Sequence, residues 1–580
     1  MAAADPPEHP SSVGDRRRPP RWWMPVVIAL VGATIGWGLR RRIGAVDEQD
    51  GNIAAVLTWF LSAFLVLALI IRAARARGRT GLALGGISVG IVTLIVLFRF
   101  DGFSGELWPQ LKWRFANSAP PRQTFQPQSV SRPDVATPKQ TEVASDGEAI
   151  DQNVPPSPPG AEDWPQFLGP ARNGILNDRL FEVPQSSEDV ESLWDIGVGS
   201  GWASFAVAED FAVTLEQRGD DECVTAYGLL DAEPRWIVRH PRRHDQAVGG
   251  EGPRSTPTID RGQVFTQGAQ GTVHCIDLAS GEVRWKVELI EDRSDWSIEA
   301  SELRITWGRA ASPLVIDDLV VLPLGGSDAA TDRSLIALDR SSGETVWKSG
   351  ADNISFASPV MMTLDDVRQI VSVNENSVTG HRIDDGETLW DFPWPGSSNA
   401  GPTCASAVAV DDNQFLIGKG YGGGSSLVRV TRGESQSWQA EEVWHSNTLL
   451  KTKFNHAVIQ NPPKRPNTET DSGASESPIA YAISNGALEA VELLPRPKRL
   501  WRQSRSTRLG QGHVVLAGEW LVGQSEFGPI EFIEATAEEY RPQFTLQALE
   551  PIVWNVPTLA GRYLIVRNSE RARCFRLPAR

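Results

Sequence analysis

Three stretches of the chain repeat one pattern, and this pattern decides the fold. They read Val273-His-Cys-Ile-Asp-Leu-Ala-Ser-Gly-Glu-Val-Arg-Trp285, Leu335-Ile-Ala-Leu-Asp-Arg-Ser-Ser-Gly-Glu-Thr-Val-Trp347 and Val378-Thr-Gly-His-Arg-Ile-Asp-Asp-Gly-Glu-Thr-Leu-Trp390. Each predicts a strand, a tight turn and a second strand, because Asp bonds turn amides and Gly adopts positive φ. The Trp that ends each copy is expected to pack between neighbouring sheets.

Looser copies extend the series along the chain. The aromatic anchors are Trp194, Trp236, Trp285, Trp347, Trp390, Trp444, Trp501 and Phe544, spaced 42 to 62 residues apart. A period near 40–50 with four short strands per unit is typical of a β-propeller. The last unit, which ends at Leu577, lacks an outer strand, and 193–196 is an outer strand with no sheet before it. Pairing the two closes the ring, so we predict an all-β, eight-bladed β-propeller, with seven blades as the alternative.

The composition restricts the class of protein. The chain has 580 residues, with 56 basic and 72 acidic side chains and a net charge of −16. Residues 1–116 hold 14 basic and 8 acidic side chains, so the remainder carries −22. A body this acidic excludes a nucleic-acid partner, which would require basic surface. Four cysteines without a CxxC motif exclude a disulfide scaffold and a cysteine-rich zinc fold.

Three apolar runs near the N-terminus predict membrane helices. The runs are 22–39, 53–71 and 81–98, and none contains a charge. Each is long enough to cross about 30 Å of hydrocarbon. We therefore predict a cytoplasmic tail (1–21) and three transmembrane helices within 22–99. A cleaved signal peptide is the alternative for the first run, although three Arg follow it in place of a small-residue cleavage site.

Arginine counts predict the orientation of these helices. Four Arg precede the first run and four follow the second, whereas three Arg beside three acidic residues lie between the first and second runs. Cytoplasmic connections are enriched in Arg. The N-terminus is therefore expected inside, and three crossings place the rest of the chain outside the cytoplasm.

A juxtamembrane segment and linker, 100–162, follow the apolar runs. Residues 116–162 are rich in Pro, Ser, Gln and Thr and almost devoid of apolar residues, which predicts disorder. Such a coil would span roughly 35–40 Å and act as a tether, with a regulatory or wall-binding role as the alternative. Two insertions interrupt the later repeats: a longer connection at 291–307 and a low-complexity loop at 460–478.

The D-x-x-[ST]-G-E-x-x-W repeat resembles the repeat of pyrroloquinoline-quinone (PQQ)-like β-propeller proteins of bacteria. The resemblance covers 163–580, and 163–174 (Asp-Trp-Pro-Gln-Phe-Leu-Gly-Pro-Ala-Arg-Asn-Gly) looks like the opening motif of that family. The family includes quinoprotein dehydrogenases and the non-catalytic assembly lipoprotein BamB, so the resemblance implies a fold more firmly than an activity.

The resemblance implies a test for catalysis. Quinoprotein enzymes use a vicinal disulfide, a Ca²⁺ held by acidic and Asn side chains, and a catalytic Asp. The sequence has no Cys-Cys pair, and we place no such ligand set on the inner strands. We therefore expect no catalytic residue, no metal and no cofactor, with PQQ and Ca²⁺ only under the alternative of an enzyme. A lipobox is also absent, which argues against the role of BamB itself.

Polar and aromatic residues just before the inner strands are expected to line the funnel of the propeller, where they could form a pocket. They are Trp202, Arg254, Arg309, Lys453, Asn455, His456, Gln511, His513, Trp554 and Asn555. The sequence thus predicts a multi-pass protein of the bacterial inner membrane whose extracytoplasmic propeller binds a protein or other macromolecule without catalysis. The alternatives are a PQQ-dependent oxidoreductase and a ligand-sensing propeller.

Overall fold

The computed structural model describes residues 23–43, 48–115, 163–246, 248–290, 305–325, 334–398, 401–434, 437–461, 477–504 and 506–580. The predicted tail (1–21), the linker (116–162) and most of the insertions at 291–307 and 460–478 lie outside the described residues. The chain divides into two compact units. One comprises Met1–Phe100 and Leu111–Phe115, and the other Asp101–Gln110 and Ala116–Arg580.

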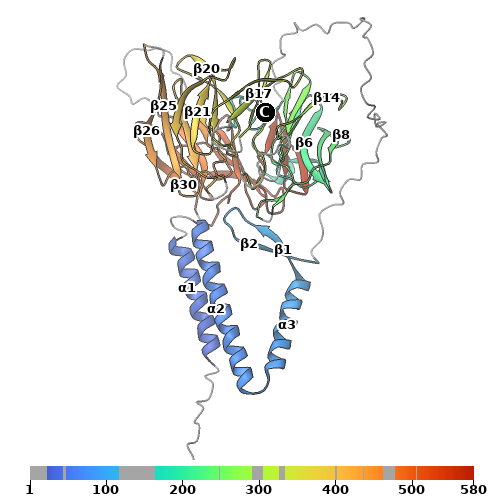
Figure 1. The fold of residues 1–580 in the computed structure, drawn as a ribbon, viewed down its shortest axis with the longest axis vertical. Coiled ribbons are helices and arrows are strands. Elements are labelled where there is room, and N and C mark those ends of the chain that lie inside the picture. The colour runs from blue at the N-terminus through green and yellow to red at the C-terminus, as the bar shows by residue number, and fades with distance from the viewer. Residues whose placement is uncertain are drawn as a thin grey trace, which may run out of the picture. The chain divides into compact units, whose positions relative to one another are not determined.

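The first unit is helical. It contains α1 (Met24–Ile43), α2 (Glu48–Ala76) and α3 (Thr80–Leu97). α1 and α2 lie side by side (Figure 1), and two glycines of α1 allow their close approach. A Cβ on Gly32 would lie 2.0 Å from Ser62 Oγ, and one on Gly36 would lie 2.2 Å from Trp59 Nε1. Small residues at this four-residue spacing are typical of tightly packed membrane helices.

The prediction of three membrane spans is wrong in number. Among the described helices, two are long and apolar enough to cross a membrane: Gln49–Ala76, with mean hydropathy 2.6, and Thr80–Leu97, with mean hydropathy 2.2. The predicted run 22–39 lies in α1, whose last turn holds Arg40, Arg41 and Arg42. Because these charges occupy the end of the helix, its uncharged part is too short for the roughly 20 residues that a span needs.

A hairpin follows α3. It is formed by β1 (Phe98–Phe103) and β2 (Pro109–Trp113), which pair in a two-stranded sheet. Its tip belongs to the second unit together with 116–580.

The second unit is almost entirely β-structure, apart from a short 3₁₀ helix, η1 (Ser187–Asp189). Its described strands form eight sheets of four or five strands and one small hairpin, β9 (Asp245–Gln246) with β10 (Gly250–Glu251). The first four large sheets contain β5 (Ala206–Ala208), β6 (Phe211–Arg218), β7 (Asp221–Gly228) and β8 (Pro234–His240); β11 (Thr258–Asp260), β12 (Gln263–Gln267), β13 (Thr272–Asp277) and β14 (Val283–Glu288); β15 (Leu314–Ile316), β16 (Leu319–Pro323), β17 (Leu335–Asp339) and β18 (Thr345–Ser349); and β19 (Val360–Leu364), β20 (Val367–Val373), β21 (Ser377–His381) and β22 (Thr388–Pro393).

The next three contain β23 (Val408–Ala409), β24 (Gln414–Lys419), β25 (Gly424–Arg432) and β26 (Trp438–Ser446); β27 (Val458–Gln460), β28 (Ile479–Ser484), β29 (Ala487–Glu492) and β30 (Lys498–Arg502); and β3 (Ile175–Leu176), β31 (His513–Ala517), β32 (Trp520–Gln524), β33 (Ile530–Glu534) and β34 (Pro542–Leu546). The last contains β35 (Thr558–Ala560), β36 (Tyr563–Arg567), β37 (Arg571–Arg576) and β4 (Glu191–Gly197). Neighbouring sheets meet at their first strands, since β5 contacts β11 and β35, β15 contacts β11 and β19, and β27 contacts β23 and β31. This is the arrangement of a β-propeller.

The two ends of the propeller sequence meet in one sheet, as predicted. β4 pairs antiparallel with β37, with Trp194 opposite Cys574. Beside this pair, Arg571 Nε donates to Asp195 Oδ1 at 2.6 Å. The described edge of the last sheet is therefore covered by a strand from the start of the domain.

The repeated turn also has the predicted geometry. Asp277 Oδ1 accepts from Ser280 N at 2.9 Å, and Asp339 Oδ1 accepts from Ser342 N at 2.8 Å. The following Gly281 and Gly343 have φ of 74° and 75°. A Cβ on Gly281 would lie 2.5 Å from Trp236 Cγ, so the turn glycine also makes room for the aromatic anchor of the preceding sheet.

The aromatic anchors join consecutive sheets through their indole N–H groups as well as by packing. The acceptor is a backbone carbonyl of the next sheet for Trp194 (Leu229 O), Trp236 (Leu278 O), Trp285 (Arg340 O), Trp347 (Ile383 O), Trp444 (Leu493 O) and Trp501 (Thr536 O). Trp390 instead donates to Gln369 Oε1 at 2.5 Å. Phe544 has no such donor and packs its ring 6.1 Å from that of Phe532.

Candidate functional site

A belt of hydroxyl groups connects the loops that precede five successive first strands. Ser204 N donates to Thr256 Oγ1, Thr256 N to Ser312 Oγ, Ser312 N to Ser358 Oγ, and Ser358 N to Ser406 Oγ, over 2.9–3.1 Å. These bonds hold neighbouring sheets at a fixed spacing around the funnel. Sequence reasoning missed the belt, although the dipeptides Thr256-Pro257, Ser312-Pro313 and Ser358-Pro359 were its signal.

The next position of the belt is occupied by His456, which lies two residues before β27. Neither ring nitrogen of His456 and neither polar atom of the Asn455 side chain has a hydrogen-bond partner among the described residues. Burial lowers the pKa of His456 to about 3, with His513 and Arg172 contributing. Buried polar groups of this kind normally bond to water or to a polar ligand.

Three of the predicted funnel residues meet in one cluster with two carboxylates. We define the funnel cluster as Glu106, Lys453, Gln511, Glu526 and Trp554. Lys453 Nζ lies 2.7 Å from Glu106 Oε2, and Gln511 Nε2 donates to Glu106 Oε1. Glu526 Oε2 accepts from Gln511 N at 2.9 Å, and its Oε1 accepts from Trp554 Nε1 at 3.0 Å. The two carboxylates thus share Gln511 as a donor.

Aromatic rings border the funnel cluster. The ring of Trp554 lies 4.7 Å from that of Trp202 and 5.4 Å from that of Phe454. Trp202 Nε1 in turn donates to Gly249 O at 2.8 Å. The cluster therefore has an apolar wall beside its charged groups.

The two predicted arginines bind backbone instead of joining the funnel cluster. Arg254 Nη2 donates to Gly249 O at 2.6 Å, and Arg309 Nη2 donates to Leu324 O at 2.7 Å. Burial lowers the pKa of each guanidinium to about 10. They hold loops in place.

The two remaining predicted residues also bond to backbone. His513 Nε2 lies 2.9 Å from Trp554 O, and burial lowers the pKa of its ring to about 4. Asn555 Nδ2 donates to Ala203 O at 2.9 Å, which links the last sheet to the first.

The opening motif contributes residues to the propeller centre that sequence reasoning did not assign to the site. Trp164 pairs with Val207 of β5, and Pro165 O accepts from Ile259 N of β11 at 2.7 Å. Arg172 Nη2 donates to Ser312 O at 2.9 Å, and burial lowers its pKa to about 9. The motif thus ties three different sheets together.

The four cysteines do not form a reactive centre. Cys223, Cys275, Cys404 and Cys574 are free thiols, and burial raises the pKa of each to about 12. Within the described part of the chain, no three His, Cys, Asp or Glu side chains come together as a metal centre would need.

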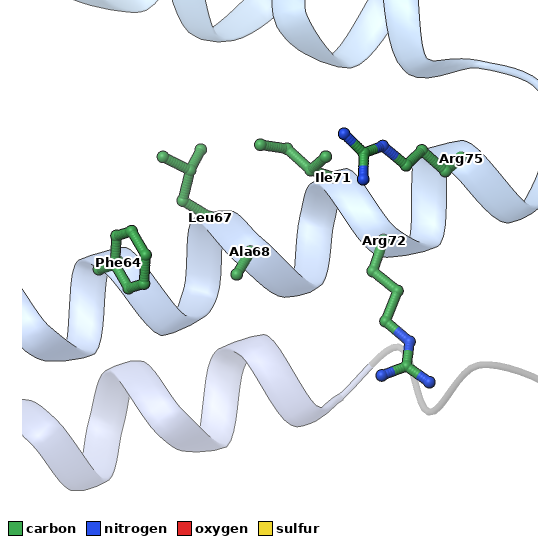
Figure 2. A pocket seen from close by; sticks show the side chains of 6 residues that line it. All are labelled: Phe64, Leu67, Ala68, Ile71, Arg72 and Arg75. Carbon is green, nitrogen blue, oxygen red and sulfur yellow. The ribbon is translucent and has the colours of Figure 1, made fainter.

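A separate hollow of about 410 Å³ lies on the helical unit (Figure 2). All its lining residues come from α2: Phe64, Leu67, Ala68, Ile71, Arg72 and Arg75. One helix provides no enclosing wall, so we assign no ligand to this hollow.

Buried neutral histidines predict acid sensitivity. Burial lowers the pKa of His274, His456 and His513 to about 4, 3 and 4. The unfolded chain takes up these protons below pH about 6.5, so folding stability should fall as the pH drops from 6.5 towards 4. At pH 5 each of the three histidines should lower the free energy of unfolding by about 2 kcal/mol.

The substitution His456→Gln should remove one of these three contributions. Between pH 7.5 and pH 5, the free energy of unfolding should therefore fall less in this variant than in the wild type. Urea unfolding of the full chain in detergent, followed by Trp fluorescence, measures the difference. An unchanged pH dependence would show that His456 is protonated in the folded protein.

Comparison with known proteins agrees with the propeller fold. A europium-containing methanol dehydrogenase is 11% identical with a TM-score of 0.51, covering 72% of this chain and 98% of that one. Quinohemoprotein alcohol dehydrogenase from Comamonas testosteroni is 12% identical with a TM-score of 0.50, covering 72% and 81%. BamB from Moraxella catarrhalis is 14% identical with a TM-score of 0.44, covering 67% and 100%. At such identities the likeness to the two dehydrogenases shows the fold alone.

The fold therefore defines a β-propeller of the kind shared by quinoprotein dehydrogenases. Residues 220–464 match the family described as outer membrane protein assembly factor BamB. This match agrees with the resemblance of the repeat to that of PQQ-like propeller proteins. No curated protein matches its sequence.

Proposed function

We propose that the chain is a membrane-anchored, non-catalytic propeller of eight blades that binds a protein or other macromolecule outside the cytoplasm. The observation that carries this proposal is the chemistry of the funnel cluster. The carboxylate of Glu106 is paired with Lys453, and both side chains are buried. The second carboxylate, Glu526, is held by the N–H groups of Gln511 and Trp554. The cluster thus keeps one net negative charge, but each of its charged groups is bonded to a neighbour within the cluster.

The funnel cluster does not fit the cofactors of the quinoprotein enzymes. Ca²⁺ takes six to eight oxygen ligands, whereas the two carboxylates here bond to an ammonium, to amide groups and to the indole of Trp554. The free thiols lie in different parts of the chain, on β7, on β13, before β23 and on β37.

Because the funnel cluster does not fit these cofactors, we expect the chain not to bind them. The purified full chain mixed with PQQ and Ca²⁺ should bind neither in equilibrium dialysis and should not reduce a dye when an alcohol or a sugar is added. Binding of both with dye reduction would favour the oxidoreductase. Crosslinking in native cells, followed by mass spectrometry, would then identify the macromolecular partner.

A ligand-sensing propeller is the second candidate, favoured by the unsatisfied groups of Asn455 and His456. A small polar ligand that bonded to them would raise the melting temperature of the wild-type chain. The variant Asn455→Ala would lose this response.

The proposed location rests on the connection between α2 and α3. Arg72 and Arg75 lie near the end of α2, and Arg77 and Arg79 follow it. No acidic residue accompanies them. A basic connection of this kind faces the cytoplasm. A crossing by α3 then places the propeller outside, whether or not α1 also crosses.

Reporter fusions should reveal this orientation. Alkaline phosphatase fused after Arg580 should be active, and a fluorescent protein that folds only in the cytosol should be dark there. The same pair of reporters fused after Gly78 should give the opposite result. Activity of the phosphatase at Gly78 and not at Arg580 would place the propeller in the cytoplasm.

A further inference from the structure

The hairpin tip that follows β1 places a glutamate inside the propeller unit. Glu106 is 4% exposed, and Lys453 is 1% exposed. Both oxygens of the Glu106 carboxylate are bonded, one to Lys453 Nζ at 2.7 Å and the other to Gln511 Nε2. Breaking a buried pair of this kind leaves an uncompensated charge in the interior, so the site is specific for a carboxylate.

The backbone beside Glu106 is bound as well. Gly105 N donates to Glu526 Oε1 at 2.5 Å. A Cβ on Gly105 would lie 2.6 Å from both Cβ and Cγ of Gln511. Any larger residue would clash, so the site accepts glycine before the glutamate.

The tip is preorganised for this contact by its own hydrogen bonds. Ser104 Oγ accepts from Trp108 N at 3.1 Å, and Ser104 O accepts from Leu107 N at 2.8 Å. A turn that is already ordered loses little conformational entropy when it binds. The shape and the charge of the tip therefore both suit the funnel.

We propose that the funnel cluster is a peptide-binding site specific for a Gly-Glu turn, and that residues 104–107 are its resident ligand. Lys453 and Gln511 bind the glutamate, and Glu526 binds the backbone N–H before it. The site is thus occupied by the chain itself. Only the six residues of β1 separate this ligand from the end of α3, so the docked turn is a second, non-covalent attachment of the propeller beside the linker 116–162.

The test is to cut the covalent linker and to measure whether the docked turn alone keeps the two parts of the chain together. A protease site is inserted within 116–162 of the full chain, which carries an affinity tag after Arg580. After cleavage in detergent, the fragment from residues 1–115 should remain with the propeller during affinity purification. Gly105→Leu and Glu106→Lys should each reduce the retained fraction at least fivefold. Both changes lie outside the propeller repeats, and circular dichroism of each variant checks that the propeller remains folded.

A matched control and a competitor complete the experiment. Glu233→Lys makes the same change of charge at an exposed turn and should retain the fragment as the wild type does. A synthetic peptide of residues 101–110 should speed release at least tenfold, whereas the same peptide with Gln in place of its Glu should not. Release of the wild-type fragment on cleavage would overturn the proposal, and so would full retention of the Gly105→Leu and Glu106→Lys fragments.

Discussion

In detergent, a chain that lacks residues 163–198 is expected to aggregate, whereas the chain that retains them stays in solution. The deletion removes β4, which pairs along the whole of β37, from Arg571 opposite Gly197 to Arg576 opposite Glu191. It also removes the opening motif. The exposed edge of the last sheet would then be free to pair with other molecules.

In the full-length chain, the substitution Trp194→Ala should cause part of the loss of stability expected from the deletion. Trp194 is 6% exposed, and its indole N–H donates to Leu229 O at 2.8 Å, joining the last sheet to the β5–β8 sheet. Truncation of a buried Trp costs about 3–5 kcal/mol, a large share of the roughly 5–15 kcal/mol that stabilises a domain. Thermal unfolding followed by circular dichroism measures the change.

The control for Trp194 is Trp438→Ala. Trp438 begins β26, is only partly buried, and packs its ring 5.6 Å from the guanidinium of Arg432. Its removal should lower the melting temperature less than removal of Trp194. Equal shifts for the two variants, or a soluble and equally stable deletion of 163–198, would show that ring closure contributes little to stability.

The second large effect is expected at Glu216, a fully buried carboxylate of β6. It accepts from Gly199 N at 2.6 Å, from Arg218 Nε at 2.8 Å and also from Thr225 Oγ1. Gly199 O in turn accepts from Arg567 Nη2 at 3.0 Å. The first and last sheets are thus connected by a chain of charge-assisted bonds.

Glu216→Ala should lower the free energy of unfolding by about 3–5 kcal/mol, because it leaves buried guanidinium groups without their carboxylate. Arg567→Met should have a similar effect. The double variant should lose less than the two single losses together, since the two residues belong to one network. Urea titration measures all three variants. The exposed Glu233→Ala is the control, with an expected change within about 0.5 kcal/mol. Strictly additive losses would contradict the network.

The sequence predicted the parts of the fold that depend on local signals. The turn of Asp277 and Gly281 needs only neighbouring residues, and it repeats at a regular spacing. Ring closure was also predictable, because 193–196 carries the pattern of an outer strand without a sheet of its own. The extent of the helices was less evident, because the pattern did not weigh the arginines that end α1.

The funnel could be predicted only in part. Lys453, Gln511 and Trp554 precede first strands, where side chains of a propeller point to its centre. Glu526 was missed because it follows the second strand of its sheet, and Glu106 because 347 residues separate it from Lys453. Partners so distant leave no pattern in a single sequence. The assignment of these residues to a function stays a prediction.

The pairing of β4 with β37 also determines when the protein can finish folding. A chain is synthesised from its N-terminus, and β4 emerges about 380 residues before the strand that it pairs with. Until residues 571–576 have been synthesised, β4 has no partner. The β5–β8 sheet, which contains Glu216, then also lacks the last sheet beside it, which contains Arg567. A nascent chain must therefore keep an unpaired strand soluble through most of translation. A product that stopped before residue 571 would retain this exposed strand, which is the kind of feature that chaperones and proteases recognise.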